Sequence, residues 1–230
     1  MRSSISPQKL KDVYAAVAER YDWQHGLLTL HSDQRGRELV VEQAVKRGDR
    51  VLDAGGGTGS TTLLAAEKAG PQGHVTQFDF SPQMQAVAHQ RAGAAGLGDR
   101  VDFQSGDMQA LPFADASFDA VLSTYSLCPL FDPVKGALEL YRVLKAGGRL
   151  GVAHSASPEN PVMYWLAERL EDVIWHLPGI SMGCRAVSVL PALRQAGARL
   201  LFERHLGVPL YPFVVFVLEK PPAAGSGGPV

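Results

Sequence analysis

Four glycines fall within ten residues in the stretch VLDAGGGTGS (51–60), directly behind a short apolar run. Together with the acid before them, three of these glycines are spaced as Asp53-x-Gly55-x-Gly57-x-Gly59. Glycine has no Cβ, so a loop of this kind lets the backbone come close to a ligand. In an open α/β sheet, ligands bind beyond the carboxyl ends of the strands, at the first turn from strand to helix. We therefore predict a ligand-binding loop here, with a carboxylate at its base.

The spacing of the loop separates the ligand classes that use glycines at this place. A nucleoside triphosphate loop needs GxxxxGK followed by Ser or Thr, and no lysine follows here. A dinucleotide fingerprint needs GxGxxG, whose third position falls on Ser60, so a nicotinamide oxidoreductase is a weaker alternative. Asp53 would repel a pyrophosphate but suits a ligand with an ammonium group and a sulfonium centre. The loop therefore favours S-adenosylmethionine.

Two further carboxylates follow the next two predicted strands. Asp79 ends the second strand, where the hydroxyl pair of a ribose would lie, and Asp107 in SGDMQALPF follows the third. A carboxylate there can accept a hydrogen bond from an adenine amino group. Three acids at successive strand ends are more specific than the glycines alone.

Short apolar runs alternate with segments of helical period, a pattern typical of an α/β fold with a parallel sheet covered on both faces. A helix over 82–95 has Ser81 as its N-cap and Pro82 at its first position. The other predicted helices cover 7–23, 61–68 and 133–143, and the predicted strands cover 50–53, 74–78, 101–104, 118–123 and 149–154.

The end of the chain has a different pattern. ARLLFERHL and FVVFVLEK are joined by a short turn and predict a hairpin, which gives an antiparallel finish to the sheet. We expect one domain over 1–220 with an N-terminal helical lid at 1–45 and an apolar cap insertion at 156–185. The segment 221–230 is expected to be a flexible tail.

The composition is that of a globular domain, with 46% hydrophobic and 20% charged residues in 230 and a formal net charge of −1. The sequence has no run of lysine or arginine, so nothing in its charge pattern indicates a nucleic acid partner. Cys128 and Cys184 are too few for a disulfide scaffold and lack CxxC spacing, and no metal site is predicted. We expect a cytoplasmic protein with neither a signal peptide nor a membrane span.

Four motifs resemble, in the correct order, those of class I S-adenosylmethionine-dependent methyltransferases, closest to the ubiquinone/menaquinone-biosynthesis type. These are VLDAGGGTG, VTQFDFSPQM, GDMQALPFADASFDAV and ELYRVLKAGGRL, and the resemblance covers about residues 13–155. It implies a Rossmann-like sheet of seven strands, mostly parallel, whose C-terminal strand runs antiparallel, with helices on both faces.

The resemblance also implies cofactor roles for individual residues. The loop would hold the donor through Asp53, Gly55, Gly57 and Gly59, and Asp79 would hold the ribose. Around the adenosine it implies Phe80 and Met84, and at the adenine Asp107 and Met108. We add Thr58, Gly106 and Ser123 to this set, and Tyr21 as either a residue that closes over the cofactor or simple helix packing.

The departures from the quinone branch concern the acceptor side. Ser60 stands where that branch usually has an acidic residue, and the region of Cys128 and Pro129 replaces a common arginine. The motifs STYSLCPLFDP and WHLPGISMGC also resemble methyltransferase-like proteins that act on small thiols.

Methyl transfer from a sulfonium needs alignment of the acceptor and exclusion of water, and a base only when the acceptor reacts as its anion. His154, after the fifth strand, is our first candidate base, and a satisfied structural histidine is the alternative. His176 and His31 are further candidates, and Tyr125 could orient the acceptor.

A helix around 161–175 is apolar on one face, which predicts a hydrophobic or aromatic small-molecule acceptor. The first hypothesis is an enzyme that methylates such an acceptor, with the ring carbon of a quinol as a candidate. A thiol or amine acceptor and a non-catalytic cofactor-binding module are the alternatives. The sequence leaves two further questions open: whether the protein makes peripheral contact with a membrane, and whether it forms a homodimer.

Overall fold

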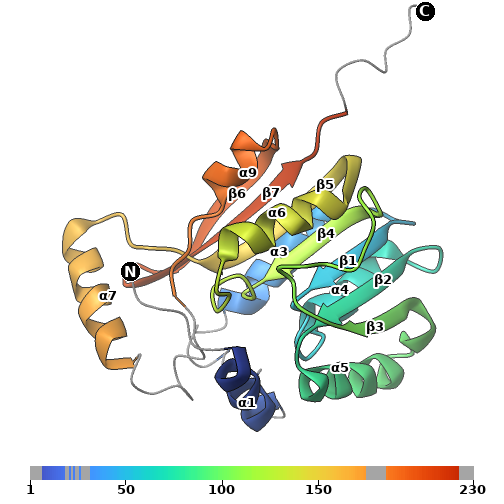
Figure 1. Cartoon of the computed structure of the whole chain (residues 1–230), viewed down its shortest axis with the longest axis horizontal. Helices are drawn as coiled ribbons and strands as arrows, with labels where there is room; N and C mark the ends of the chain where they lie inside the picture. The colour runs from blue at the N-terminus through green and yellow to red at the C-terminus, as the bar shows by residue number, and fades with distance from the viewer. Residues whose placement is uncertain are drawn as a thin grey trace, which may run out of the picture.

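A seven-stranded sheet forms the centre of the protein (Figure 1). The computed structural model describes residues 7–18, 21, 23, 26, 32–174 and 185–222. The order of the strands across the sheet is β3-β2-β1-β4-β5-β7-β6. The strands are β1 (Arg50–Ala54), β2 (His74–Asp79), β3 (Val101–Ser105), β4 (Phe118–Thr124), β5 (Leu144–Ser155), β6 (Arg199–Val208) and β7 (Tyr211–Glu219).

The direction of the strands confirms the predicted fold class. β1 to β5 pair in parallel, and β7 runs antiparallel to both β5 and β6. The switch between β1 and β4 at the centre of the order places the loop after β1 at the crevice where such sheets bind ligands.

Helices cover both faces of the sheet (Figure 1). One core cluster lies between the sheet and α6 and α9, and a second lies between the sheet and α3 and α4. The helices are α1 (Pro7–Val17), α3 (Ser32–Ala44), α4 (Ser60–Ala69), α5 (Pro82–Ala94), α6 (Pro133–Val143), α7 (Pro161–Ile174) and α9 (Leu190–Gln195), with a short 3-10 turn at Gly98–Arg100.

The starts of α5 and α6 follow from local chemistry. The Ser81 hydroxyl accepts a hydrogen bond from the backbone N–H of Met84 at 3.4 Å, and Asp132 accepts one from the N–H of Lys135 at 2.9 Å. Each cap is followed by a proline, whose missing N–H costs nothing at that position. The predicted N-cap of α5 is confirmed.

The predicted cap insertion contains α7, which Figure 1 shows at one side of the molecule, away from the strands. Several of its large apolar side chains are exposed: Val162, Tyr164, Trp165, Leu166 and Leu170. The rest of the insertion, 175–184, lies outside the described residues, so its role as a lid stays a prediction. Within the described residues, no helix has the length and apolar character needed to cross a membrane.

Candidate functional site

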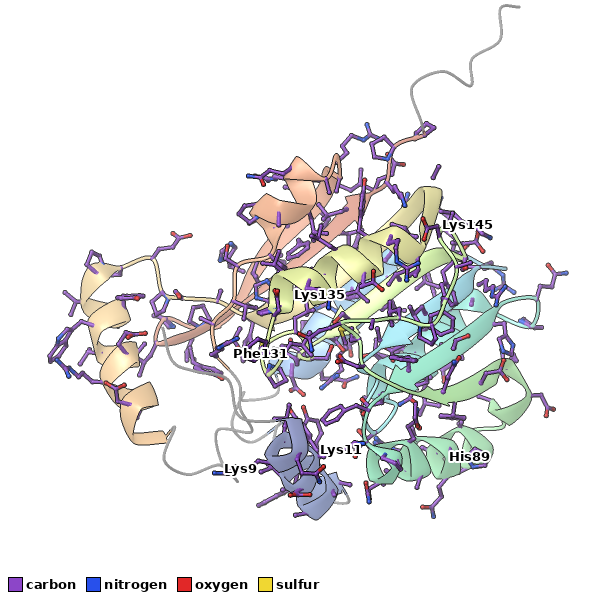
Figure 2. All side chains as sticks on the ribbon, viewed as in Figure 1. Lys9, Lys11, His89, Phe131, Lys135 and Lys145 are labelled. Atoms are coloured by element: carbon purple, nitrogen blue, oxygen red, sulfur yellow. The ribbon has the colours of Figure 1, made fainter. Side chains whose placement is uncertain are left out.

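A cavity of about 460 Å³ lies across the carboxyl ends of four adjacent strands, β3, β2, β1 and β4. α1 contributes Lys11 and Tyr14 to its wall, and the loop before α6 contributes Phe131; Figure 2 labels Lys11 and Phe131. This volume is in the usual range for a small-molecule site. The other lining residues are Gln8, Leu10, Tyr21, Arg37, Gly55, Gly56, Gly57, Thr58, Phe78, Asp79, Phe80, Pro82, Met84, Ser105, Gly106, Asp107, Met108, Gln109, Thr124, Tyr125, Ser126, Pro129 and Leu130.

The glycine loop is a wall of this cavity, and its backbone needs glycine at two positions. Gly55 has a φ of 73°, and its N–H donates to the Phe78 carbonyl at 2.7 Å. A Cβ at Gly55 would lie 2.2 Å from the Cβ of Ser126, so no side chain fits there. Gly57 has a φ of 54°, and a Cβ there would meet nothing within 4 Å. The loop is therefore closely packed against neighbouring residues at Gly55, whereas there is free space beside it at Gly57.

Asp79 fixes the loop from the neighbouring strand. One carboxylate oxygen accepts from the N–H of Gly57 at 2.9 Å, and the other accepts from the N–H of Ser81 at 2.8 Å. Burial raises the pKa of Asp79, and its bonds to backbone N–H groups act in the opposite direction. Each carboxylate oxygen can accept a second hydrogen bond. Because Asp79 also lines the cavity, it can receive a pair of hydroxyls from a ligand.

Asp53 lies beneath the loop, and its role in holding the donor stays a prediction. The residue is fully buried and is not among the described residues that line the cavity. Its Oδ2 accepts from the Thr62 hydroxyl at 2.6 Å, and Oδ1 has no hydrogen-bond partner among the described residues. Burial raises the pKa of Asp53 to about 6. The hydrogen bond from Thr62 and the positive charge of Arg37 lower this pKa, but by less than burial raises it. Asp53 is therefore placed to influence a ligand by its charge and to support the loop from below.

This pKa predicts a pH dependence. We expect the affinity for S-adenosylmethionine to rise as the pH rises through about 6, because only ionised Asp53 attracts a cationic ligand. The effect of pH on the stability of the fold has the opposite sign. A folded pKa above the usual value of 3.8 means that stability falls as the pH rises from about 4 to about 6. Calorimetric titrations between pH 5 and 8 would measure the effect on binding.

The control is Asp53→Asn, which keeps the shape of the side chain and removes the titration. We expect this variant to bind S-adenosylmethionine more weakly and to lose the change in affinity near pH 6. Any pH dependence that comes from Asp79 should stay the same. Identical pH profiles for Asp53→Asn and the unaltered chain would contradict the assignment.

The predicted adenosine residues lie together at the β2 and β3 end of the cavity. Phe80, Met84, Gly106, Asp107 and Met108 all line it. The Asp107 carboxylate is exposed and accepts from the N–H of Gln109 at 2.8 Å. The structure thus brings these five residues to one place.

Aromatic side chains close this end of the cavity from the side of α1. Tyr21 lies 5.9 Å from Tyr14 between ring centroids, and Tyr14 lies 5.8 Å from Phe80 in an edge-on contact. All three line the cavity. A flat, apolar ligand group would find aromatic partners here.

Two predicted cofactor residues lie behind the wall of the cavity. Ser123 is fully buried in β4, and its hydroxyl lies 2.6 Å from that of Ser126, which is the residue that lines the cavity. Gly59 is the N-cap of α4 and has a φ of 87°, and a Cβ there would lie 2.9 Å from the Cβ of Ala88. Neither residue is among the described residues that line the cavity, and their cofactor roles stay predictions. Thr58 does line the cavity.

His154 is buried in the core and is not among the described residues that line the cavity. Its ring packs edge-on against Phe216 at 5.8 Å, and Nδ1 lies 2.8 Å from the Ser155 carbonyl oxygen. Burial lowers its pKa, which favours the neutral ring. β5 contributes no described residue to the cavity wall, because the cavity lies at the ends of the four strands β3, β2, β1 and β4. These contacts are those expected of the structural-histidine alternative, and a catalytic role for His154 stays a prediction. His31 and His176 lie outside the described residues.

Tyr125 does line the cavity, just past the end of β4. Its backbone has a φ of 57°, an uncommon conformation for a residue other than glycine and one that is frequent at functional sites. Its ring packs edge-on against Phe213 at 5.4 Å, and burial raises the pKa of its hydroxyl. Tyr125 is therefore a neutral, rigidly held group at the β4 end of the cavity.

Sequence reasoning missed Arg37 and Ser126. Arg37 lies on α3, is 6% exposed and lines the cavity. Its segment, HSDQRGRE, is rich in charge and reads as a solvated helix face, so no local signal separates Arg37 from Arg35. Ser126 could have been found from its position two residues past the end of β4.

Comparison with known proteins gives one consistent result. The profile of the ubiE/COQ5 methyltransferase family matches residues 2–171. A demethylmenaquinone methyltransferase of Thermus thermophilus is 40% identical over 64% of this chain and 66% of its own length. A second, from Lactobacillus johnsonii, is 30% identical over 71% of this chain and 67% of its own length. The matched region thus spans about two thirds of these relatives.

Solved structures agree in the fold. Geranyl diphosphate C-methyltransferase from Streptomyces coelicolor has a TM-score of 0.65 at 16% identity, over 80% of this chain and 74% of its own. The YcgJ protein from Bacillus subtilis also has a TM-score of 0.65, at 21% identity, over 82% of this chain and 99% of its own. At these identities the likeness concerns the fold alone.

Proposed function

Because the chain belongs to the ubiE/COQ5 methyltransferase family, we propose that it transfers a methyl group from S-adenosylmethionine to a small hydrophobic acceptor. The observation that carries this proposal is the arrangement around Asp79. This buried carboxylate holds Gly57 and Ser81 by their N–H groups and also faces the cavity. Such an acid suits a ribose, and the open space above Gly57 suits a ligand lying against the loop.

The lining residues fit S-adenosylmethionine along the order of the strands. The adenine would lie at the β3 end, near Asp107 and Met108, and the ribose at Asp79 on β2. The methionine portion would lie along Gly55 to Thr58 after β1, toward Tyr125 after β4. Asp53 beneath the loop adds negative charge on the side of the cationic groups.

In this proposal the bound donor supplies an already activated methyl group on its sulfonium. The chain then needs to hold the acceptor in line with that methyl and keep water out. Tyr125 is the proposed orienting residue because it is buried, rigidly held and at the cavity surface. We assign no general base within the described residues. His154 would have to leave its contact with Phe216 to serve as one.

A quinol ring is the first candidate acceptor. The relatives named demethylmenaquinone methyltransferase support it, as do the apolar residues at the β4 side of the cavity. These are Pro129, Leu130 and Phe131, with Phe131 72% exposed at the surface. A flat ring with an apolar tail would find contacts there. A small thiol or amine stays the alternative acceptor.

The proposal includes a cytoplasmic setting and brief contact with a membrane surface, where a lipid-soluble acceptor would be found. The exposed apolar side chains of α7, Trp165 and Leu170 among them, support that contact. A homodimer is equally compatible with them.

The test is transfer of labelled methyl from S-adenosylmethionine to a panel that holds demethylmenaquinol, small thiols and an amine lipid head group. We expect label in the quinol, with one S-adenosylhomocysteine formed per methyl transferred. Label in a thiol would overturn the quinol assignment and leave methyl transfer intact. Tight donor binding with no label in any acceptor would favour the non-catalytic module.

A further inference from the structure

Arg37 is a buried cation that lines the cavity, and the account above gives it no task. It comes from α3, which packs against α4 and against β4, β5 and β7. Its guanidinium lies 5.1 Å from the centroid of the Tyr125 ring. A charged group that is 6% exposed is costly to bury unless it is paired and hydrogen-bonded. Its partners therefore show how much of its binding capacity is already in use.

The protein's own contacts leave part of the guanidinium available. Nη1 donates to the Thr124 hydroxyl at 3.1 Å and to the Thr61 hydroxyl at 3.4 Å. Nη2 lies 3.6 Å from the Asp33 carboxylate, which is beyond a good hydrogen bond. A guanidinium has five N–H donors and pairs best with a carboxylate through two parallel bonds. No contact of this two-bond kind is made within the described residues.

The position of Arg37 indicates which ligand group it meets. Thr61 lies in the first turn of α4, directly after the glycine loop, and Thr124 ends β4. Arg37 is therefore at the β1 and β4 end of the cavity, whereas the predicted adenine and ribose residues are at the β3 and β2 end. Arg37 also lowers the pKa of Asp53 by its charge, which indicates that the two opposite charges lie near each other.

We infer that Arg37 binds the carboxylate of the methyl donor's methionine portion through its guanidinium, and so fixes the donor along the loop between β1 and β4. The inference rests on the proposed function, because it takes S-adenosylmethionine as the ligand. The pairing explains why α3 carries a buried arginine toward the cavity. Asp53 then acts on the cationic groups of the same ligand portion, so the two residues together select an amino acid group.

An oxyanion of the acceptor has the same chemistry and would be the other ligand for this guanidinium. The donor is favoured because Thr61 and Thr124, the two hydroxyls that hold Nη1, belong to the elements that flank the glycine loop. The apolar residues proposed for the acceptor, Leu130 and Phe131, are in the loop before α6.

The experiment compares S-adenosylmethionine with decarboxylated S-adenosylmethionine, which lacks only the carboxylate, by calorimetric titration of the whole chain. In the unaltered chain we expect the decarboxylated compound to bind roughly 10- to 100-fold more weakly, the value of a hydrogen-bonded charged group. This comparison does not depend on the folding of any variant. Arg37→Met should weaken binding of S-adenosylmethionine by a similar factor and leave that of the decarboxylated compound nearly unchanged.

Arg35→Met is the matched control, because Arg35 is on the same helix, is exposed and pairs with Glu38 at 3.1 Å. We expect it to bind both compounds as the unaltered chain does. Equal binding of the two compounds to the unaltered chain would overturn the role of Arg37 and leave the proposed function standing. Normal donor binding by Arg37→Met, combined with a higher KM for the acceptor, would assign Arg37 to the acceptor and overturn the inference. Failure of both compounds to bind the unaltered chain would instead overturn the proposed function.

Discussion

Substitution of Gly55 by alanine is expected to abolish measurable binding of S-adenosylmethionine. The new Cβ would lie 2.2 Å from the Cβ of Ser126 and 2.9 Å from the terminal methyl carbon of Met108, so the loop or the residues after β4 must move. Gly55 also has a φ of 73°, which a residue with a Cβ adopts at a cost. Loss of two or more loop contacts predicts at least a ~100-fold weaker affinity.

Gly147→Ala is the matched control for this substitution. Gly147 has a φ of 75°, nearly that of Gly55, but a Cβ there would meet nothing within 4 Å. The backbone strain is therefore similar and the steric clash is absent. Calorimetric titration of both variants, with thermal unfolding to check that each is folded, separates the two effects. Donor binding by folded Gly55→Ala at the affinity of Gly147→Ala would contradict the packing described for the loop.

Replacement of Asp79 by asparagine is the second change with a large expected effect. Both carboxylate oxygens accept backbone N–H groups, those of Gly57 and Ser81. An amide presents an NH₂ group to one of those donors, so a buried hydrogen bond is lost and the loop is released. The variant also loses the negative charge that would receive the ribose hydroxyls. We expect donor affinity to fall by roughly 100-fold or more.

The control for Asp79→Asn is Asp102→Asn. Asp102 is an exposed aspartate on β3 that pairs with His74 at 2.8 Å and does not line the cavity. Titration with adenosine alone adds a second comparison, because it keeps the ribose and lacks the methionine portion. We expect Asp79→Asn to weaken both ligands, whereas Asp102→Asn should weaken neither. Unchanged adenosine binding by Asp79→Asn would contradict the ribose assignment.

Most of the fold could be predicted from the sequence because its local signals agree with one another. Ser81 and Pro82 mark the start of α5, and the apolar runs mark the strands. β5 differs most, because it begins at Leu144 rather than at Arg149. Its pairing with β4 is interrupted between Phe118 and Ala120, and this irregularity accommodates the KAGG segment. The apolar period does not show such an irregularity.

The site could be predicted in part, and the limit is the direction of side chains. Asp79 and the adenosine residues other than Met84, which is on α5, lie at or just after strand ends that the pattern locates, and all of these residues line the cavity. Asp53 and Ser123 also lie at or near strand ends, but their side chains are covered by the loop and by Ser126. Side chains alternate between the faces of a strand, so one position decides whether a residue faces the ligand.

His154 and Arg37 show a second limit, which comes from contacts distant in the sequence. His154 ends a strand as expected, but β7 lies along β5 and supplies Phe216 to its ring. Arg37 reaches the cavity only because α3 packs across β4, which brings it to Thr124, 87 positions away. Neither contact has a local signal in the sequence.

Titration of the whole chain with S-adenosylmethionine, alongside the same titration with NADH, tests the central claim most directly. The cavity described here predicts saturable binding of S-adenosylmethionine with one site per chain and no saturable binding of NADH. Saturable binding of NADH, with none of S-adenosylmethionine, would contradict the account and favour the oxidoreductase alternative.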